Sequence, residues 1–170
     1  MSVNSKPVLL DNCAISACVA AGAWSALASR YTLETVEEVE REATTGYQHR
    51  AIIPPREFRE QVAVHAVSDA ARFDMQAAHA GLAVLDEGER DLWVHALART
   101  DAWVLCGPDI ASIKFGVLNG YGDRLISLEQ LLKAIGHTPR QKLADHQTEK
   151  WLQAVIGKIV VEEKFRQLTK

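Results

Sequence analysis

Short apolar runs alternate along the chain with longer segments in which apolar positions recur every three or four residues. Short runs are typical of buried strands, and the longer spacing is typical of amphipathic helices. A sheet whose strands alternate with helices is usually parallel and covered by helices on both faces. The pattern therefore predicts an α/β protein with strands at 8–10, 31–33, 81–85, 103–106 and 124–126.

Capping residues, glycines and prolines mark where the predicted helices begin and end. The segment from 56 to 80 follows a Pro-Pro pair and is predicted to hold two helices, with a break near Ser68. The remaining helices are predicted at 15–29, 35–46, 86–99, 109–118 and 127–136.

The composition changes after Pro139. Residues 143–168 are predicted to form one long amphipathic helix or two, with an apolar face made of Trp151, Leu152, Val155, Ile156, Ile159 and Val160. An apolar stripe of that length is not left in water, so we expect it to pack on its own domain or on a second copy of the chain. The chain then divides into a domain at 1–136 and a helical C-terminal extension at 137–170.

Two aspartates stand where predicted strands give way to helices. Asp11 ends the first strand, and Asp109 follows the strand at 103–106. Aspartate is also a favoured helix N-cap, so a structural role explains each of them about as well as a functional one. The sequence leaves both interpretations open at these positions.

Glutamates crowd the helix predicted after Thr35. Thr35 and Glu38 have the spacing of a capping box, which predicts a structural role for Glu38 at the helix start. Glu42 lies at the edge of the apolar stripe of this helix, from which it can face a cleft beside the core. Glu40 flanks the other edge and is the weaker candidate.

The helix predicted from Asp86 has a similar arrangement. Asp86 and Glu89 also fit a capping box, so both a structural role and a role at a metal site are open to Glu89. Asp91 lies in the first turns of an otherwise apolar helix, where the helix dipole favours a carboxylate. It therefore faces either solvent or a site. His95 follows one turn later and is expected at the surface.

Residues at strand ends and adjacent helix starts meet at one edge of a parallel sheet. Carboxylates that meet there repel each other unless a cation lies among them, and an all-oxygen ligand set selects hard ions such as Mg²⁺ or Mn²⁺. Two such ions can activate water and stabilise both oxygens of an in-line phosphoryl displacement. The predicted ligands are Asp11, Glu42, Asp91 and Asp109, with Glu89 as a further candidate.

Four segments resemble the motifs of the PIN-domain family, in the same order and with similar spacing over roughly residues 7–136. They are 8–12, a strand with a leading aspartate; 35–42, a segment that ends in a glutamate; 85–92, with a Gly-Glu helix start; and 103–109, a strand followed by aspartate. The chain departs from the family pattern at Cys13, where Ser, Thr or Asn is usual, and at Gly107-Pro108, which replaces a more usual polar pair.

The resemblance implies a three-layer α/β/α PIN-like domain with a central parallel sheet. It further implies an endoribonuclease that hydrolyses phosphodiester bonds of RNA, with catalytic Asp11, Glu42, Asp91 and Asp109 holding Mg²⁺ or Mn²⁺. Members of the family are often toxins of toxin–antitoxin pairs. The resemblance therefore adds an antitoxin protein to RNA as an expected partner, and the apolar stripe at 143–168 adds a second copy of the chain. The alternative is a PIN-fold module that binds a partner without cutting.

The overall composition narrows the classes of function further. The net charge of −3 is not the strongly basic footprint of a protein that holds nucleic acid through charge alone. Three scattered cysteines and six histidines without a short metal-binding spacing argue against a disulfide scaffold and a zinc motif. Because the chain lacks a stretch of membrane-spanning length and a signal peptide, we expect a cytoplasmic protein that does not enter the membrane.

Overall fold

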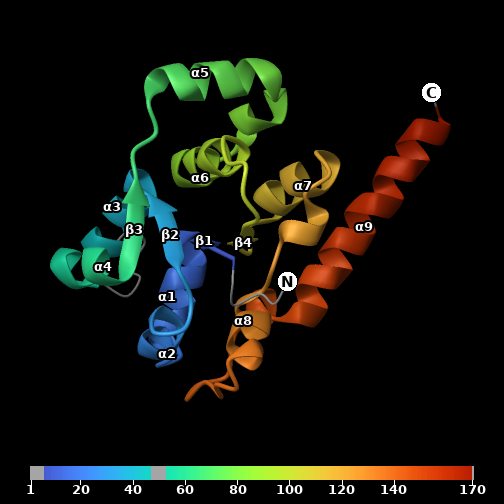
Figure 1. Ribbon diagram of the computed structural model, residues 1–170. Helices are drawn as coiled ribbons and strands as arrows, with labels where there is room; N and C mark the ends of the chain where they lie inside the picture. The colour runs from blue at the N-terminus through green and yellow to red at the C-terminus, as the bar shows by residue number, and fades with distance from the viewer. Residues whose placement is uncertain (1–5, 47–52, 170) are drawn as a thin grey trace.

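A four-stranded sheet forms the centre of the molecule. The computed structural model describes residues 6–46 and 53–169. The strands pair in the order β3-β2-β1-β4, and every pair is parallel (Figure 1). They are β1 (Val8–Leu10), β2 (Leu33–Val36), β3 (Val62–His65) and β4 (Val104–Cys106).

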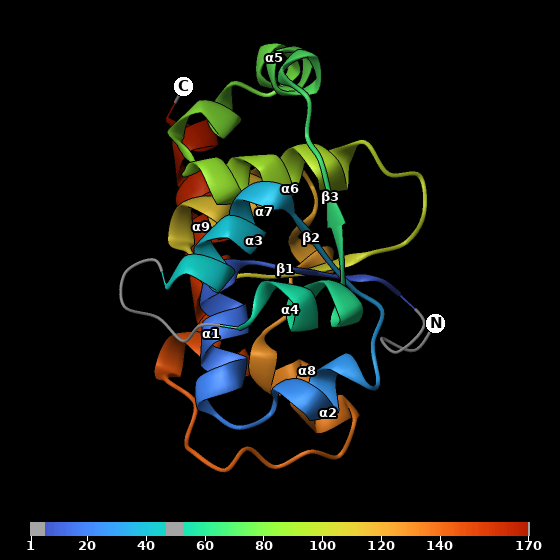
Figure 2. The same cartoon turned by 90° about the vertical axis from the view of Figure 1, so that its left-hand side faces the viewer.

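Helices cover both faces of this sheet, which confirms the predicted three-layer α/β/α architecture. Figure 2 shows α6 and α7 on one side of β1, with α1, α2 and α8 on the other. The helices are α1 (Asn12–Ala20), α2 (Trp24–Ala28), α3 (Glu37–Thr45), α4 (Pro55–Gln61), α5 (Asp69–Ala78), α6 (Glu87–Leu97), α7 (Ile110–Leu118), α8 (Leu128–Ala134) and α9 (Glu149–Leu168). Short 3₁₀ turns lie among them at η3 (Ala80–Val84), η4 (Gly122–Arg124) and η5 (Asp145–Gln147).

Local signals in the sequence placed β1, β4, α6, α7 and α8 close to their observed positions. The start of α8 shows why, because Ser127 and Gln130 form a complete capping box with backbone-to-side-chain bonds of 3.0 and 3.2 Å. The single helix predicted at 15–29 is instead two helices. Gly22 separates them because it adopts a left-handed backbone with φ of 66°, a common way for a helix to end.

The strand predicted at 81–85 is wrong, because these residues form η3. Leu82 and Leu85 are buried, whereas Val84 is 78% exposed. Burial three residues apart is the spacing of a helical turn, and a half-buried strand would bury alternate residues. The strand predicted at 124–126 is reduced to one parallel bridge between Leu105 and Leu125.

The sequence did not predict β3, which lies inside the segment expected to hold two helices. The break near Ser68 is confirmed, since Ser68 caps α5 by accepting a bond from the Ala71 N–H. β3 itself is an edge strand in which Val62 alone is fully buried. Its pairing with β2 over four residues, from Leu33 with Val62 onward, creates the strand. That pairing has no local signature in the sequence.

Helix α9 packs on the domain through its first turns and its middle. Leu152 and Ile159 are buried, and the nearest neighbour of the helix is α7. Val161, Phe165 and Leu168, in the second half, are 51%, 65% and 82% exposed. No helix in the described ranges combines the length and the apolar character needed to cross a membrane.

Aromatic rings fill the core between α6, β4 and α7. Trp93 and Trp103 are buried and meet edge to face, with ring centroids 6.0 Å apart. Phe115 packs edge-on against Trp93 at 5.0 Å. Gly116 in α7 lies directly over the Trp93 ring, where an added Cβ would be 2.8 Å from the nearest ring carbon. The close approach of α7 to α6 therefore requires glycine at this position.

Gly116→Ala is expected to destabilise the protein by roughly 1–3 kcal/mol, because the added methyl group overlaps a buried ring that has no space to move. Gly157→Ala is the matched control, since Gly157 is also helical and nothing lies within 4 Å of its added Cβ. Alanine there should stabilise α9 by up to about 1 kcal/mol. Chemical denaturation of the three proteins measures both changes, and a Gly116→Ala protein as stable as the parent would contradict the packing argument.

Candidate functional site

The parallel pairing of β1 with β4 brings Asp11 and Asp109 to the same edge of the sheet. Leu10 pairs with Cys106, and the Asp11 N–H donates to the Cys106 carbonyl oxygen at 3.1 Å. Asp11 caps α1 by accepting from the Cys13 N–H at 3.0 Å. Asp109 caps α7 by accepting from the N–H groups of residues 111 and 112. The capping role is thus confirmed for both, and it fixes where each carboxylate lies.

A cleft of about 380 Å³ opens at this edge of the sheet. Among the described residues that line it, Arg41 is basic and seven are acidic: Asp11, Glu38, Glu42, Asp86, Glu87, Glu89 and Asp109. Four of the five predicted site residues therefore line one cleft. The fifth, Asp91, does not.

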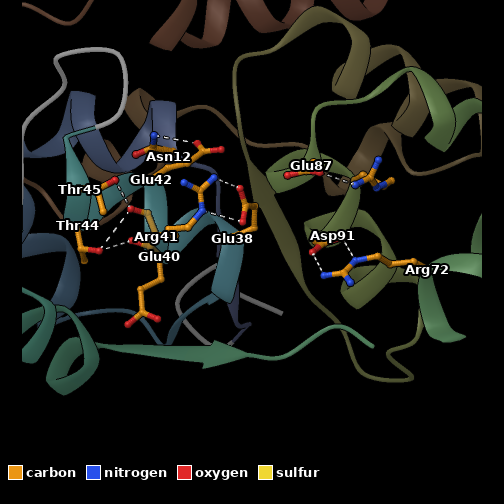
Figure 3. A network of polar contacts seen from close by, with 11 residues as sticks. Asn12, Glu38, Glu40, Arg41, Glu42, Thr44, Thr45, Arg72, Glu87 and Asp91 are labelled. Carbon is orange, nitrogen blue, oxygen red and sulfur yellow. Dashed lines mark hydrogen bonds and ion pairs between the residues drawn. The ribbon is translucent and has the colours of Figure 1, made fainter. Parts of the chain in front are cut away.

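Glu42 reaches the cleft from α3, and Asn12 holds it in place. Asn12 is fully buried at the start of α1, and its Nδ2 donates to Glu42 Oε2 at 3.1 Å (Figure 3). Ser16 Oγ in turn lies 3.4 Å from Asn12 Oδ1. Sequence reasoning missed Asn12 as a positioning residue. Its signal was a polar side chain next to Asp11, in a stretch that is otherwise apolar.

The predicted capping box of Thr35 and Glu38 is wrong. Thr35 belongs to β2, where its Oγ1 donates to the Leu10 carbonyl oxygen at 2.7 Å and ties β2 to the end of β1. Helix α3 begins two residues later without a side-chain cap. Glu38 instead forms an ion pair with Arg41, and the hydrogen bond from that guanidinium lowers the pKa of Glu38.

Glu40, the weaker candidate on the same helix, has a different partner. It is buried, and Arg59 of α4 donates to both of its oxygens, with Nη2 at 2.7 Å from Oε2. Glu40 is not part of the cleft lining. The structure therefore favours Glu42 over Glu40 as a site residue.

Asp91 is buried on the side of α6 that faces α5. Arg72 donates to both of its oxygens, from Nε at 2.8 Å and from Nη2 at 2.7 Å (Figure 3). Residues two apart lie about 200° apart around a helix, so Asp91 cannot face the cleft that Glu89 faces. The structure separates Asp91 from the other predicted ligands for this reason.

Glu89 shows how much negative charge the cleft gathers. Burial, together with the nearby charges of Asp109, Asp11 and Asp86, raises the pKa of Glu89 from 4.5 to about 8. The side chain of Asp86 makes no cap bond, so the predicted capping box is incomplete, although the Asp86 backbone lies close enough to the Glu89 carboxylate to lower its pKa. Glu89 thus has both of the roles that the sequence left open: a helix-start contact and a place in the cleft.

The donor set of the cleft fits a hard divalent cation. Asp11, Glu42, Glu89 and Asp109 offer carboxylate oxygens, which suit Mg²⁺ and Mn²⁺. Within residues 6–46 and 53–169, no three of the cleft acids have oxygens that all lie within 4.8 Å of one another.

Glu89→Gln is expected to change how stability depends on pH in the metal-free protein. The pKa of Glu89 is raised in the folded state from 4.5 to about 8. The contribution of this group to the free energy of unfolding is therefore fully present below about pH 4.5 and is lost as the pH rises toward 8. Glutamine removes this loss. In EDTA at pH 8 the variant should be more stable than the parent by about 1–3 kcal/mol, after allowance for solvent screening.

Chemical denaturation at pH 5 and pH 8 measures this effect. Glu87→Gln is the matched control, since Glu87 is exposed on the same helix turn and should leave the pH dependence unchanged. A parent and a Glu89→Gln protein that lose the same stability between the two pH values would show that charge does not accumulate at Glu89.

Comparison of the chain with known protein families finds no matching family model, and comparison with curated proteins finds no match. The resemblance to the PIN-domain family therefore stays a prediction based on the four motifs. The arrangement of the acidic cleft is an independent observation, because it comes from the packing of β1, β4, α3 and α6.

Proposed function

We propose that the protein is a metal-dependent endoribonuclease that hydrolyses phosphodiester bonds of RNA. The observation that carries the proposal is the cleft at the carboxyl edge of β1 and β4, where Asp11, Glu42, Glu89 and Asp109 gather around one space. The pKa of Glu89 supports it, because burial and the nearby charges of Asp109 and Asp11 raise that pKa, and a cation in the cleft would make the ionised carboxylate more favourable.

Asp11, Glu42 and Asp109 are the residues that would hold Mg²⁺ or Mn²⁺. When bound, such an ion neutralises phosphate charge and makes water a better nucleophile at neutral pH. The chain contributes by fixing its own carboxylates. Two of them are held by helix-cap bonds, and Asn12 orients Glu42. Ligands held in this way keep a site in the geometry that the reaction needs.

Arg41 is the basic residue that the structure places in the cleft lining. A guanidinium binds phosphate with two parallel hydrogen bonds, so Arg41 is suited to hold a backbone phosphate of the substrate. In the structure Arg41 is paired with Glu38, and about half of its side chain is exposed. It can therefore turn toward a ligand by giving up one surface ion pair, which costs little. With a net charge of −3, binding of RNA would depend on bound metal and a few such contacts.

A protein-interaction role is the second candidate function, and the exposed end of α9 is the observation that favours it. Val161, Phe165 and Leu168 leave apolar surface in water there. Scattered exposed apolar residues are common, so this observation is weaker than the acidic cleft. The family resemblance suggests an antitoxin as the partner, and the apolar stripe of α9 suggests a second copy of the chain.

Purified protein should cleave RNA in the presence of Mg²⁺ or Mn²⁺, and EDTA should stop the reaction. Glu42→Gln should reduce the rate by more than about a hundredfold, since loss of a group that only supports a metal ligand already costs 10–100-fold. Glu37→Gln, an exposed change in the first turn of the same helix, should leave the rate unchanged. Intact RNA after incubation with clean protein and either metal would favour the protein-interaction role.

Asp91→Asn tests whether Asp91 is a metal ligand, as the family resemblance implies, or only the partner of Arg72. Because both Asp91 oxygens bind Arg72 outside the cleft, the variant should lose roughly 1–3 kcal/mol of stability, discounted because the Arg72 side chain is partly exposed. Its rate of RNA cleavage at a temperature where it is folded should match the parent.

Asp69→Asn is the control for this variant. Asp69 also pairs with Arg72 but is fully exposed, so its removal should change stability by less than about 1 kcal/mol. Thermal melting and a single-turnover cleavage assay give both readouts. A folded Asp91→Asn protein without activity would restore Asp91 to the set of metal ligands.

A further inference from the structure

A second cluster of titratable side chains lies outside the acidic cleft, where α6 crosses β2 and β3. Glu34 on β2 is buried, and His65 on β3 and His95 on α6 are half-buried beside it. None of the three belongs to the cleft lining. One potential ligand atom from each of the three lies within 4.8 Å of the other two. Among the described residues, this is the group of histidine, cysteine or acidic side chains that meets that criterion.

The distances from Glu34 to the two imidazoles are close to those between neighbouring donors of a tetrahedral metal site. Glu34 Oε2 lies 2.9 Å from His65 Nε2 and 3.4 Å from His95 Nε2. Metal–ligand distances of about 2.0–2.1 Å, as for zinc, place neighbouring tetrahedral donors roughly 3.3 Å apart. The two observed distances lie on either side of that value. The imidazole rings stack with centroids 4.2 Å apart and 20° between their planes. Because the Nε2 lone pair lies in the plane of each ring, one ring must turn before both nitrogens point at one ion.

His65 Nε2 is a buried nitrogen without an aligned hydrogen-bond partner, although it is close to Glu34. Buried polar atoms of this kind are rare because their desolvation is not compensated. A nitrogen that faces a carboxylate and a second imidazole, and that makes no hydrogen bond with either, is placed to bind a shared cation.

Arg99 already occupies part of this position. Its Nη1 contacts Glu34 Oε2 and lies 3.2 Å from His95 Nε2. A guanidinium nitrogen is only a donor, so His95 accepts from Arg99 in the tautomer whose Nε2 carries a lone pair, and in the other tautomer Nε2 donates to Glu34 Oε2 at 3.4 Å. On its other side the guanidinium donates to Asp101, from Nε to Oδ1 at 2.8 Å and from Nη2 to Oδ2 at 2.7 Å. Arg99 therefore keeps a partner when it moves away from Glu34.

We propose that Glu34, His65 and His95 bind a transition-metal dication of the zinc type, which displaces the Arg99 guanidinium toward Asp101. Two imidazoles and a carboxylate select zinc, cobalt, nickel or ferrous iron over magnesium. The site thus differs in metal preference from the all-oxygen cleft and is independent of the proposed nuclease activity. Because the three ligands come from β2, β3 and α6, a bound ion joins the edge strand to the helix that carries Glu89.

The test uses Co²⁺ as a visible probe, added to the purified full chain with excess Mg²⁺ present to occupy the cleft. Tetrahedral Co²⁺ with nitrogen ligands absorbs visible light far more strongly than octahedral Co²⁺ with oxygen ligands. We expect a strong band that saturates near one equivalent and disappears when Zn²⁺ is added. A weak octahedral spectrum alone would overturn the proposal. This measurement uses the parent protein, so it does not depend on the folding of a variant.

Variants then assign the band to these residues. His65→Gln and His95→Gln should each weaken Co²⁺ binding by at least about tenfold, as even supporting groups of a metal site contribute that much. His146→Gln, an exposed histidine elsewhere in the described chain, should bind like the parent. Arg99→Gln should bind Co²⁺ more tightly, because it removes the competing cation. Unchanged binding in both His65→Gln and His95→Gln, or weaker binding in folded Arg99→Gln, would refute the assignment.

Discussion

The parallel pairing of β1 with β4 is the constraint on which the candidate site depends. With Leu10 opposite Cys106, both strands end at the same edge, so Asp11 and Asp109 must lie near each other. Helix-cap bonds then hold both side chains at that edge. Like charges held close together cost electrostatic energy, and here the charges of Asp109 and Asp11 add to burial, the larger cause, in raising the pKa of Glu89 to about 8.

Two buried acidic side chains outside the cleft are each paired with an arginine. Asp91 is neutralised by Arg72 and Glu40 by Arg59, each through two hydrogen bonds. Such pairing is expected, because an unpaired buried carboxylate is strongly unfavourable. Two of the seven acids that line the cleft are also paired, Glu38 with Arg41 and Glu87 with Arg90. Among the described residues of the lining itself, however, Arg41 stands against seven acids. Figure 3 shows Asp91 with Arg72, and Glu38 with Arg41. The contrast identifies the cleft, and not acidity in general, as the place for a cation.

Helix α6 supports two groups of different chemistry. Glu89 in its first turn faces the all-oxygen cleft, while His95 near its end meets Glu34 and His65 under the edge strand. Its middle is anchored by Trp93, which packs against Gly116 and Phe115 of α7. A rigid core helix keeps both groups in register with the sheet, so a change that shifts α6 alters both.

Sequence by itself determined the α/β class, the starts of α7 and α8, and the positions of Asp11, Glu42 and Asp109, because alternation, helix period and capping act within a few residues. Only the tertiary structure decided that residues 62–65 form a strand, that Arg72 binds Asp91 and that His95 meets Glu34. The last two contacts join residues 19 and 61 positions apart. Such contacts follow from how β3, α5 and α6 pack on the sheet, and a local pattern of residues contains no information about that packing.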